Sequence, residues 1–384
     1  MNAFFREDSS DGGRRGVLRT RAGSISVPFF MPDATRAAVR GTTTEEVHTV
    51  GIGAVVVNTY HLMLQPGAEH IGRVGGIHRF MGWSGPILSD SGGYQVYSLI
   101  HRNSELGSIT EQGAEFKSVL DGSKHLLTPE LAIAIQFDLG VDMMVVLDDP
   151  RPNDVSEEEI ANAVERTIRW AKRCREEYDR QIVERGISEE ERPLLFGVVQ
   201  GGMFPALRTR CAEGLLEFDF DGYGFGGRHI DADGNFMADI LAHTASLIPE
   251  DRVRFALGIG TPWDIIRCHA LGWDMFDCVI PTREGRHGRL FLWKSQSKIE
   301  MVAMEHVTSP QGDFYETINI NNGGFAEDCS PVDSSCDCPL CTHHTRAYLH
   351  HLFRVNDPLG GRLASIHNLR FYARLMEWLR DGIG

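Results

Sequence analysis

Positive charge and cysteine are both scarce in this chain. It has 38 lysines and arginines against 53 acidic residues, a formal net charge of -15, which argues against non-specific coating of nucleic acids. Eight cysteines in 384 residues are too few for a disulfide scaffold. No apolar run reaches the roughly 18 residues of a membrane helix, and the first residues lack the layout of a secretion signal. We therefore expect a soluble, cytoplasmic protein with no membrane partner.

A dinucleotide-binding motif is also lacking, because no Gly-x-Gly-x-x-Gly opens a helix after a strand. What the chain does contain is short apolar runs that alternate with amphipathic segments of helical length. This order predicts an α/β protein with a parallel sheet, and roughly eight such units between residues 30 and 300 favour a closed (β/α)8 TIM barrel. The expected strands follow a hairpin over 14–31 that leads into 28–32, and they cover 54–58, 85–90, 142–147, 194–199, 222–227, 254–260 and 275–280.

Helix signals lie between these strands. Thr128 followed by proline is typical of a helix start, and Gly140 of a helix end. Ser156 followed by three glutamates indicates the start of a long amphipathic helix. Shorter helices are expected near 44–50, 205–217, 235–247 and 262–271.

Polar or small residues follow several of the expected strands, where each strand ends. Active sites of TIM barrels lie at these carboxyl ends, so the residues should meet in one pocket. Asp277 is notable because it interrupts an apolar run, where an acid is costly unless it is paired or used. Bracing of the following turn, which is rich in glycine and arginine, is the structural alternative for it. The residues at strand ends are Asp90, Asp148, Gln200, Gly226, Gly227, Leu257, Gly258 and Asp277.

Three carboxylates and an amide in one pocket suit a nucleoside. One acid attacking an anomeric carbon while another handles a proton can break a glycosidic bond through a covalent sugar intermediate. A third acid, an amide and backbone donors could read the edge of a flat heterocycle, with Tyr94 stacked on its face. Metal binding by the three acids is the rival interpretation, although no histidine at a strand end supports it. A carbohydrate hydrolase would explain the acids alone.

A second group of residues predicts a metal site. Cys336, Cys338 and Cys341 place three thiols within six residues, and in a reducing compartment thiols with a downstream histidine form a closed tetrahedral zinc site. Four protein ligands leave no position for water, so the zinc should be structural. From spacing alone, the fourth ligand stays open between Cys329 and the histidines His343, His344, His350, His351 and His367.

A local cationic face is possible on this acidic body. Residues 281–300 hold more cations than acids, which would suit a polyanion, although a solvated charged face explains them equally well. The cations are Arg283, Arg286, Arg289, Lys294 and Lys298, and the acids are Glu284 and Glu300.

Together, the motifs resemble the tRNA-guanine transglycosylase family along nearly the whole chain. The matching segments are 58–61 with 66–67, 90–95, 200–202, 276–279 with 281–283, and the cysteines through 366–369. The resemblance implies a (β/α)8 barrel with a zinc subdomain, usually a homodimer, which exchanges guanine at the wobble position of tRNA for a 7-deazaguanine. The bacterial form is favoured because the chain stops soon after the cysteines. We expect the barrel and hairpin over 1–300, the zinc subdomain over 301–370, and a helix packing on the barrel over 371–384.

The resemblance also implies roles for single residues. Asp277 matches the nucleophile on the ribose, and Asp90 the general acid/base. Asp148 and Gln200 match residues that read the purine edge, and Gly227 a backbone donor. Matching the rest of the family's site, Tyr94 and Leu257 would sandwich the base, and Cys336, Cys338, Cys341 and His367 would hold zinc. If the polymer is tRNA, we expect its contacts in the local group of cations, at Arg283, Arg286 and Arg289.

Three segments depart from the family's usual sequence. Residues 228–232 read Arg-His-Ile-Asp-Ala where small apolar residues and a glutamate are common, Pro150 follows Asp148-Asp149, and 301–330 is longer than usual. The first two lie beside the expected place of the 7-substituent, where an arginine disfavours a cationic group unless it points away or pairs with Asp231 or Asp233.

The leading hypothesis is a pentosyltransferase that inserts 7-aminomethyl-7-deazaguanine into tRNA through a covalent aspartyl-ribose intermediate. Queuine as the incoming base, or DNA as the polymer, are alternatives with the same chemistry. A non-catalytic tRNA-binding partner subunit is the alternative of another class, but such a subunit would be expected to have lost the acids.

Overall fold

The computed structural model describes residues 3–7, 14–294 and 314–381. Its centre is an eight-stranded parallel sheet in the order β4-β14-β13-β12-β11-β10-β6-β5. A parallel bridge between Asp33 and Val56 joins the two ends of this order and closes the sheet into a barrel. The predicted fold class is therefore confirmed. The strands are β4 (Phe29–Pro32), β5 (Val55–Asn58), β6 (Ile87–Asp90), β10 (Met143–Val145), β11 (Leu194–Val199), β12 (Gly222–Phe225), β13 (Val253–Ala256) and β14 (Met275–Cys278).

Helices surround these strands because each strand is buried on both faces and needs an apolar cover. The side chains of β5, β11, β12 and β13 are buried throughout. Helix α6 (Pro129–Leu139) begins at the cap Thr128 and ends at Gly140, as predicted, and Ser156 caps the long α7 (Glu157–Arg185). The other helices of this layer are α1 (Thr44–Thr49), α8 (Pro205–Leu216), α9 (Ala238–Ser246) and α10 (Pro262–Ala270).

One predicted turn is a helix in the structure. The arginine-rich segment after β14 forms α11 (Ile280–Arg286), with proline in its first turn. Proline favours this position because its missing N–H would have no partner there and its φ suits a helix. The expected hairpin is present as β2 (Arg15–Thr20) and β3 (Gly23–Val27), with an unpredicted third strand, β1 (Phe4–Glu7), along β2.

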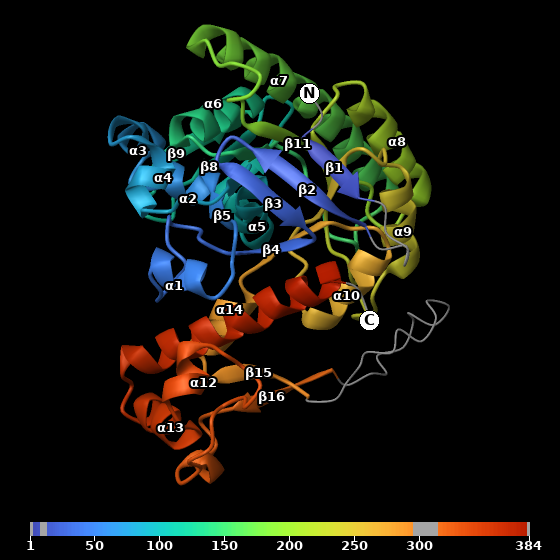
Figure 1. Cartoon of the computed structure of the whole chain (residues 1–384). Helices are drawn as coiled ribbons and strands as arrows, with labels where there is room; N and C mark the ends of the chain where they lie inside the picture. The colour runs from blue at the N-terminus through green and yellow to red at the C-terminus, as the bar shows by residue number, and fades with distance from the viewer. Residues whose placement is uncertain (1–2, 8–13, 295–313, 382–384) are drawn as a thin grey trace.

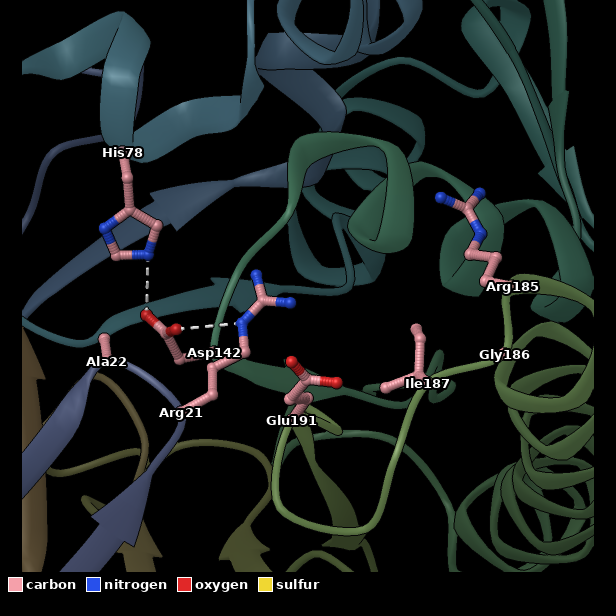
Figure 2. Close-up of a pocket in the computed structure, with 8 residues that line it drawn as sticks. All are labelled: Arg21, Ala22, His78, Asp142, Arg185, Gly186, Ile187 and Glu191. Carbon is pink, nitrogen blue, oxygen red and sulfur yellow. Dashed lines mark hydrogen bonds and ion pairs between the residues drawn. The ribbon is translucent and has the colours of Figure 1, made fainter.

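This three-stranded sheet lies across the amino-terminal ends of the barrel strands (Figure 1). Arg21, in its hairpin turn, donates to Asp142, which directly precedes β10, over 3.1 Å. His78 bonds to the other oxygen of Asp142 over 2.9 Å. Figure 2 shows both interactions at one side of a charged cavity, which Arg185 and Glu191 also line.

Two insertions extend the barrel. After β5 come α2 (Thr59–Leu64), α3 (Ala68–Arg73) and α4 (Gly76–Met81). After β6 come α5 (Gly93–Arg102), the short helix η1 (Ser104–Leu106) and an antiparallel sheet of β7 (Gly107–Ile109), β8 (Ala114–Lys117) and β9 (Lys124–Leu127). This sheet was not predicted, because its strands are short and partly exposed.

The carboxyl-terminal region has a smaller core of its own. Strands β15 (Arg289–Trp293) and β16 (Tyr315–Asn319) pair beside η3 (Gly323–Phe325), α12 (Pro339–His343) and α13 (Arg346–Arg354). The long α14 (Pro358–Asp381) lies between this region and the barrel (Figure 1). It continues without a break through residue 370, where the zinc subdomain was expected to end and a separate helix to begin. Lys298, Glu300 and much of the longer segment 301–330 lie outside the described residues.

Within the described ranges, no helix has both the length and the apolar character that crossing a membrane requires.

Candidate active site and metal centre

Among the described residues, Asp90, the last residue of β6, accepts hydrogen bonds from neutral donors only. Asn58 Nδ2 donates to its Oδ2 over 2.6 Å, and Gln95 Nε2 does so over 3.2 Å. The backbone N–H groups of Thr59 and Gly92 donate to Oδ1 over 3.3 and 3.1 Å. Gly92 has a φ of +80°, and a Cβ there would lie 2.9 Å from the backbone nitrogen of Tyr60. Only glycine fits this turn without strain, so the turn is built to bring its N–H to the carboxylate.

Asp277, on β14, has a single hydrogen-bond partner among the described residues, the backbone N–H of Gly258 over 2.7 Å. Burial raises the pKa of Asp277 to about 7, and the charge of Asp33 adds to this rise. Burial also raises the pKa of Asp90 to about 7, against the backbone hydrogen bond from Thr59 and with the help of the charge on Asp277. The charge of Asp277 thus reaches Asp90, and carboxylates that have a like-charged neighbour and neutral hydrogen-bond partners ionise at unusually high pH.

Asp148 and Gln200 form a second pair at the same end of the barrel. Gln200 Nε2 donates to Asp148 Oδ2 over 2.7 Å. Burial raises the pKa of Asp148 to about 6, although this hydrogen bond opposes the rise. A Cβ on Gly226 would lie 2.4 Å from Gln200 Nε2, so glycine is needed there for the amide to approach. Gly227 follows with a φ of +93°.

The remaining predicted base-binding residues flank these pairs. Tyr94 is on α5, four residues after Asp90, and is 57% exposed. Leu257 follows β13 and directly precedes Gly258, the hydrogen-bond partner of Asp277. An exposed aromatic ring on the helix that follows the strand of Asp90 offers a surface on which a flat ligand can stack.

The predicted cationic residues are distributed over two elements. Arg283 and Arg286 are on α11. Burial lowers the pKa of Arg286 most, and the positive charges of Arg40 and, to a smaller extent, Arg283 lower it further. Arg289 begins β15, where it lies 3.8 Å from Glu284. Arg283 and Arg286 thus lie close together, and Arg289 belongs to the carboxyl-terminal sheet.

The predicted metal ligands converge. The ligand atoms of Cys336, Cys338, Cys341 and His367 lie within 4.8 Å of one another, and no other such group of three or more occurs among the described residues. His367 Nδ1 is 3.3 Å from Cys341 Sγ, while its Nε2 is 2.7 Å from the carbonyl oxygen of Phe291. A backbone carbonyl on the far nitrogen orients the ring and leaves Nδ1 free to bind a metal. The residues therefore fit a tetrahedral metal ion.

The competing ligands lie elsewhere. His350 Nδ1 bonds to the carbonyl oxygen of Ile320 over 2.7 Å, and Cys329 is exposed. The three acids of the barrel mouth do not form a metal-binding group in the described structure. Metal binding by these acids, the rival interpretation from sequence, thus has no support.

Sequence reasoning missed three residues beside the site. Asn58 was noted as a strand end and as part of a matching motif without a role, yet it donates to Asp90 and caps α2 by accepting from the N–H of His61. Asp33 follows β4 and acts electrostatically on both barrel acids. Its position directly after a buried strand was a signal that could have been used.

The third is Arg208, which is completely buried on α8. Its guanidinium donates to the carbonyl oxygens of Val199 and Gly202, on either side of Gln200, over 2.7 to 3.1 Å. It also stacks on the ring of Phe225 at 4.0 Å. Burial lowers its pKa to about 9. A buried cation without a carboxylate partner is uncommon, and here it holds the loop that carries Gln200. Nothing in the local sequence distinguishes it from other arginines.

A closed barrel with buried acids at its carboxyl-terminal mouth and a Cys3His cluster beside it defines a class of barrel enzymes that carry a metal-binding subdomain. Comparison with known proteins narrows this class. Residues 8–384 match the family model described as "Queuine tRNA-ribosyltransferase".

Curated proteins of the same name are similar over almost their whole length. The protein of Thermoanaerobacter sp. (strain X514) is 41% identical over 380 residues, which cover 99% of this chain and 92% of the relative. That of Zymomonas mobilis is 41% identical over 370 residues, covering 96% and 88%. That of Pelotomaculum thermopropionicum is 41% identical over 377 residues, covering 98% and 92%. The chain belongs to the queuine tRNA-ribosyltransferase family, and it is a transferase, which confirms the resemblance inferred from its motifs.

Proposed function

We propose that this tRNA-guanine transglycosylase replaces the guanine at the anticodon wobble position by 7-aminomethyl-7-deazaguanine, through a covalent bond between Asp277 and the ribose. The observation that carries this proposal is the pair formed by Asp90 and Asp277. Both residues are half-buried at one mouth of the barrel, and both have neutral hydrogen-bond partners and a pKa of about 7. One can therefore be ionised while the other holds a proton near neutral pH.

The reaction would run in two balanced halves. An Asp277 oxygen bonds to C1′ as the bond from C1′ to guanine breaks, and Asp90 gives its proton to the departing base. The incoming base then gives a proton to Asp90, and its nitrogen bonds to C1′ as the Asp277 ester breaks. Each half is a displacement at one carbon, so the configuration at C1′ is retained overall.

Base recognition would come from the second pair. Asp148 and Gln200 can accept and donate along the edge of guanine, with the backbone of Gly227 as a further donor, while Tyr94 and Leu257 would cover its faces. Arg208 supports this surface, because it holds both carbonyls that flank Gln200. The hydrogen bond from Gln200 to Asp148 would open or shift when a base binds.

The incoming base is the finer part of the proposal. Arg228 is exposed, and its backbone carbonyl accepts from Asn153 Nδ2 over 3.2 Å. Asp231 is occupied by Asn235 and by the backbone of Asp233, so Arg228 has no carboxylate partner among the described contacts. An unpaired guanidinium near the 7-substituent would disfavour the aminomethyl cation, which is why queuine stays an alternative. Mass spectrometry of tRNA incubated with each base separates the two.

Zinc is the metal we propose for the Cys3His cluster. Three thiolates and an imidazole suit Zn²⁺ and leave no ligand position for water, so its role would be to stabilise the carboxyl-terminal region. Elemental analysis should find one zinc per chain. Cys338→Ala should abolish it, whereas Cys329→Ala, at an exposed cysteine, should retain it.

The polymer we propose is tRNA, contacted by Arg283, Arg286 and Arg289, with the enzyme acting as a homodimer. The test is incorporation of labelled guanine into unmodified tRNA. We expect exchange by the wild type and none by Asp277→Ala. Exchange by that variant would refute the covalent mechanism. Binding of tRNA without exchange by the wild type would instead favour the non-catalytic partner subunit.

A further inference from the structure

Asp33 lies between the two proposed catalytic acids. It follows β4 directly, and β4 pairs on one side with β14, where Asp277 is in register with Met31. On its other side, Asp33 itself bridges Val56 of β5, the strand in which Asn58 pairs with Asp90 of β6. Because adjacent parallel strands are about 4.8 Å apart, these pairings place Asp33 at the carboxyl-terminal mouth, next to the strand of Asp277.

The electrostatic effects of Asp33 agree with this position. Beyond the main effect of burial, the charge of Asp33 raises the pKa of both Asp90 and Asp277. It also counteracts the lowering of the pKa of His61 and of Arg286 by burial and neighbouring arginines. The charge of Asp33 thus reaches groups on β6, β14, α2 and α11, the elements around the same mouth of the barrel.

The Asp33 carboxylate is fixed at one oxygen. Its Oδ1 accepts from the backbone N–H of Thr35 over 3.0 Å and from the Thr35 hydroxyl. Its Oδ2 takes part in no hydrogen bond or ion pair that the described part of the chain shows. The side chain is half-buried. This leaves a preorganised acceptor at the mouth of the barrel, with no protein donor on its second oxygen.

We propose that Asp33 Oδ2 accepts a hydrogen bond from the 2′-hydroxyl of the nucleotide whose base is exchanged, and that this contact makes the enzyme select RNA over DNA. The inference rests on the proposed function, in which Asp277 bonds to C1′. The 2′-carbon is the direct neighbour of C1′, so its hydroxyl lies beside the nucleophile Asp277. Asp33 follows the strand next to that of Asp277. A 2′-hydroxyl is the group by which a protein distinguishes the two polymers at a single nucleotide.

The contact also suits the chemistry. When C1′ is attacked, positive charge develops on the sugar, and hydrogen bonds to the neighbouring hydroxyl strengthen in such transition states. An anionic acceptor benefits more than a neutral one from this change. Asp33 should therefore contribute to kcat/KM on RNA and contribute little on a substrate that lacks the hydroxyl.

The experiment compares two anticodon stem-loops that differ only at the target nucleotide, one with ribose and one with 2′-deoxyribose. Labelled-guanine exchange is measured with wild type and with Asp33→Val, which is similar in size but has no acceptor. We expect the wild type to prefer the ribose by about 10- to 100-fold in kcat/KM, the range for a hydrogen bond to a charged group. In Asp33→Val the ratio of kcat/KM for the ribose substrate to that for the deoxyribose substrate should fall to within about threefold of unity. The variant should lose kcat/KM on the ribose substrate and keep it on the deoxyribose one.

Asp121→Asn is the matched control. Asp121 Oδ1 also accepts from the backbone and hydroxyl of the residue two positions on, Ser123, but it lies in the turn between β8 and β9. This variant should keep the wild-type ratio. Asp33→Asn, which retains an acceptor oxygen and the Thr35 turn, should give an intermediate ratio. A ratio near unity in the wild type, or an unchanged preference in Asp33→Val, would overturn the proposal.

A binding measurement keeps this inference separate from the proposed function. Fluorescence anisotropy with 2′-hydroxyl and 2′-fluoro stem-loops needs no turnover, and fluorine preserves the sugar pucker while removing the donor. If the wild type exchanges no guanine yet binds the hydroxyl form more tightly, and Asp33→Val does not, the proposed function fails and the role of Asp33 stands. If the wild type and the variant bind both forms equally, with normal exchange and no ribose preference, the role of Asp33 fails and the proposed function stands.

Discussion

The two ends of the barrel hold their acids in opposite ways, with fully buried acids at the amino-terminal end and half-buried ones at the mouth. At the amino-terminal end, Asp274 is paired with the Arg14 guanidinium through both oxygens, at 2.9 and 3.1 Å. Asp142 there contacts Arg21 and His78. At the carboxyl-terminal mouth, the hydrogen bonds that Asp90 and Asp277 accept within the described part of the chain all come from neutral donors. Burial raises the pKa of Asp274 as well, but the contact with Arg14 opposes this rise and braces the fold. At the mouth, no cation opposes the effect of burial on Asp90 and Asp277 through a hydrogen bond that the described residues show, so these acids are better placed to exchange protons near pH 7.

Neighbouring residues show the same contrast within the mouth. Asp148 accepts from the Gln200 amide, and burial raises its pKa to about 6. The next residue, Asp149, is completely buried and pairs with Arg151 and Arg166. Position in the fold therefore does not by itself identify a functional acid. The kind of partner is what distinguishes Asp148 from Asp149.

The largest expected effect is on guanine exchange, when the acids at the two ends of β14 are each replaced by an amide. Asp277→Asn should lower guanine exchange by at least about 10⁴-fold, because an amide cannot serve as the nucleophile. Asp274→Asn, three residues earlier, should keep the turnover of the folded fraction within about threefold. Exchange assays normalised to folded protein measure both. Equal losses of guanine exchange in the two variants would contradict the proposed difference between the two ends of the barrel.

Loss of a cationic partner should matter for stability at the amino-terminal end. Arg14→Gln leaves Asp274 buried without its cation and should lower the free energy of unfolding by about 3–5 kcal/mol at pH 7, as measured by urea denaturation. Adding Asp274→Asn to this variant should recover part of the loss, because the uncompensated charge is then gone. A cost below about 1 kcal/mol would mean that the pair contributes little.

At the carboxyl-terminal mouth, replacing an acid is expected to raise the free energy of unfolding instead of lowering it. Because the pKa of Asp277 is raised by folding, its burial costs nothing below the unfolded value of 3.8 and becomes costly as the pH rises toward 7. Asp277→Asn should therefore be more stable than the wild type by on the order of 2–4 kcal/mol at pH 8, and the gain should shrink toward pH 4. Thermal unfolding at both pH values tests this. A destabilised variant at pH 8 would contradict it.

The rate of exchange should depend on pH in a bell shape. With Asp90 and Asp277 both near a pKa of 7, one must be ionised and the other protonated, so kcat/KM should be highest near pH 7 and fall about tenfold per unit far to either side. Asp33→Asn should shift the acidic limb to lower pH, since it removes a negative charge that raises both values. A flat profile from pH 5 to 9 would exclude this pair as acid and base.

The smallest effect concerns the cavity of Figure 2. Burial opposes the charged form of His78, but the hydrogen bond and charge of Asp142 raise its pKa above 6.5. The stabilisation is complete below the unfolded pKa and is lost as the pH rises through the folded one. His78→Gln should thus cost about 1 kcal/mol at pH 5.5 and less at pH 9. Urea titrations at the two pH values give the difference, and an equal cost at both would assign the loss to packing.

Much of the barrel was predictable because buried parallel strands are continuous apolar runs. Strand Leu194–Val199 has the predicted bounds, and the acids at strand ends followed from the fold rule for TIM barrels. The metal ligands were predictable from thiol spacing, apart from the choice of His367, which came from resemblance. The sheet of β7 to β9 was missed, since four-residue strands such as Ala114–Lys117 carry too short an alternation.

The roles of Asp33 and Asn58 could not be predicted, because they depend on closure of the barrel. The partner of Asn58 is 32 residues away, and the position of Asp33 depends on β14, near the other end of the barrel sequence. The segment 28–32 was interpreted as the end of a hairpin rather than as a barrel strand, so its following acid was overlooked. Arg208 gave no signal, since only its complete burial separates it from the many surface arginines.

Helix α14 has a consequence for how the molecule melts. His367 of the metal cluster, Asn368, which bonds to the backbone of Phe291, and Tyr372, whose hydroxyl donates to the carbonyl oxygen of Gly260 in the barrel, are on consecutive turns of this one helix. Fraying it would release contacts in both regions together. Heating should accordingly unfold the small carboxyl-terminal region and the barrel in a single cooperative transition, and calorimetry should record one peak instead of two.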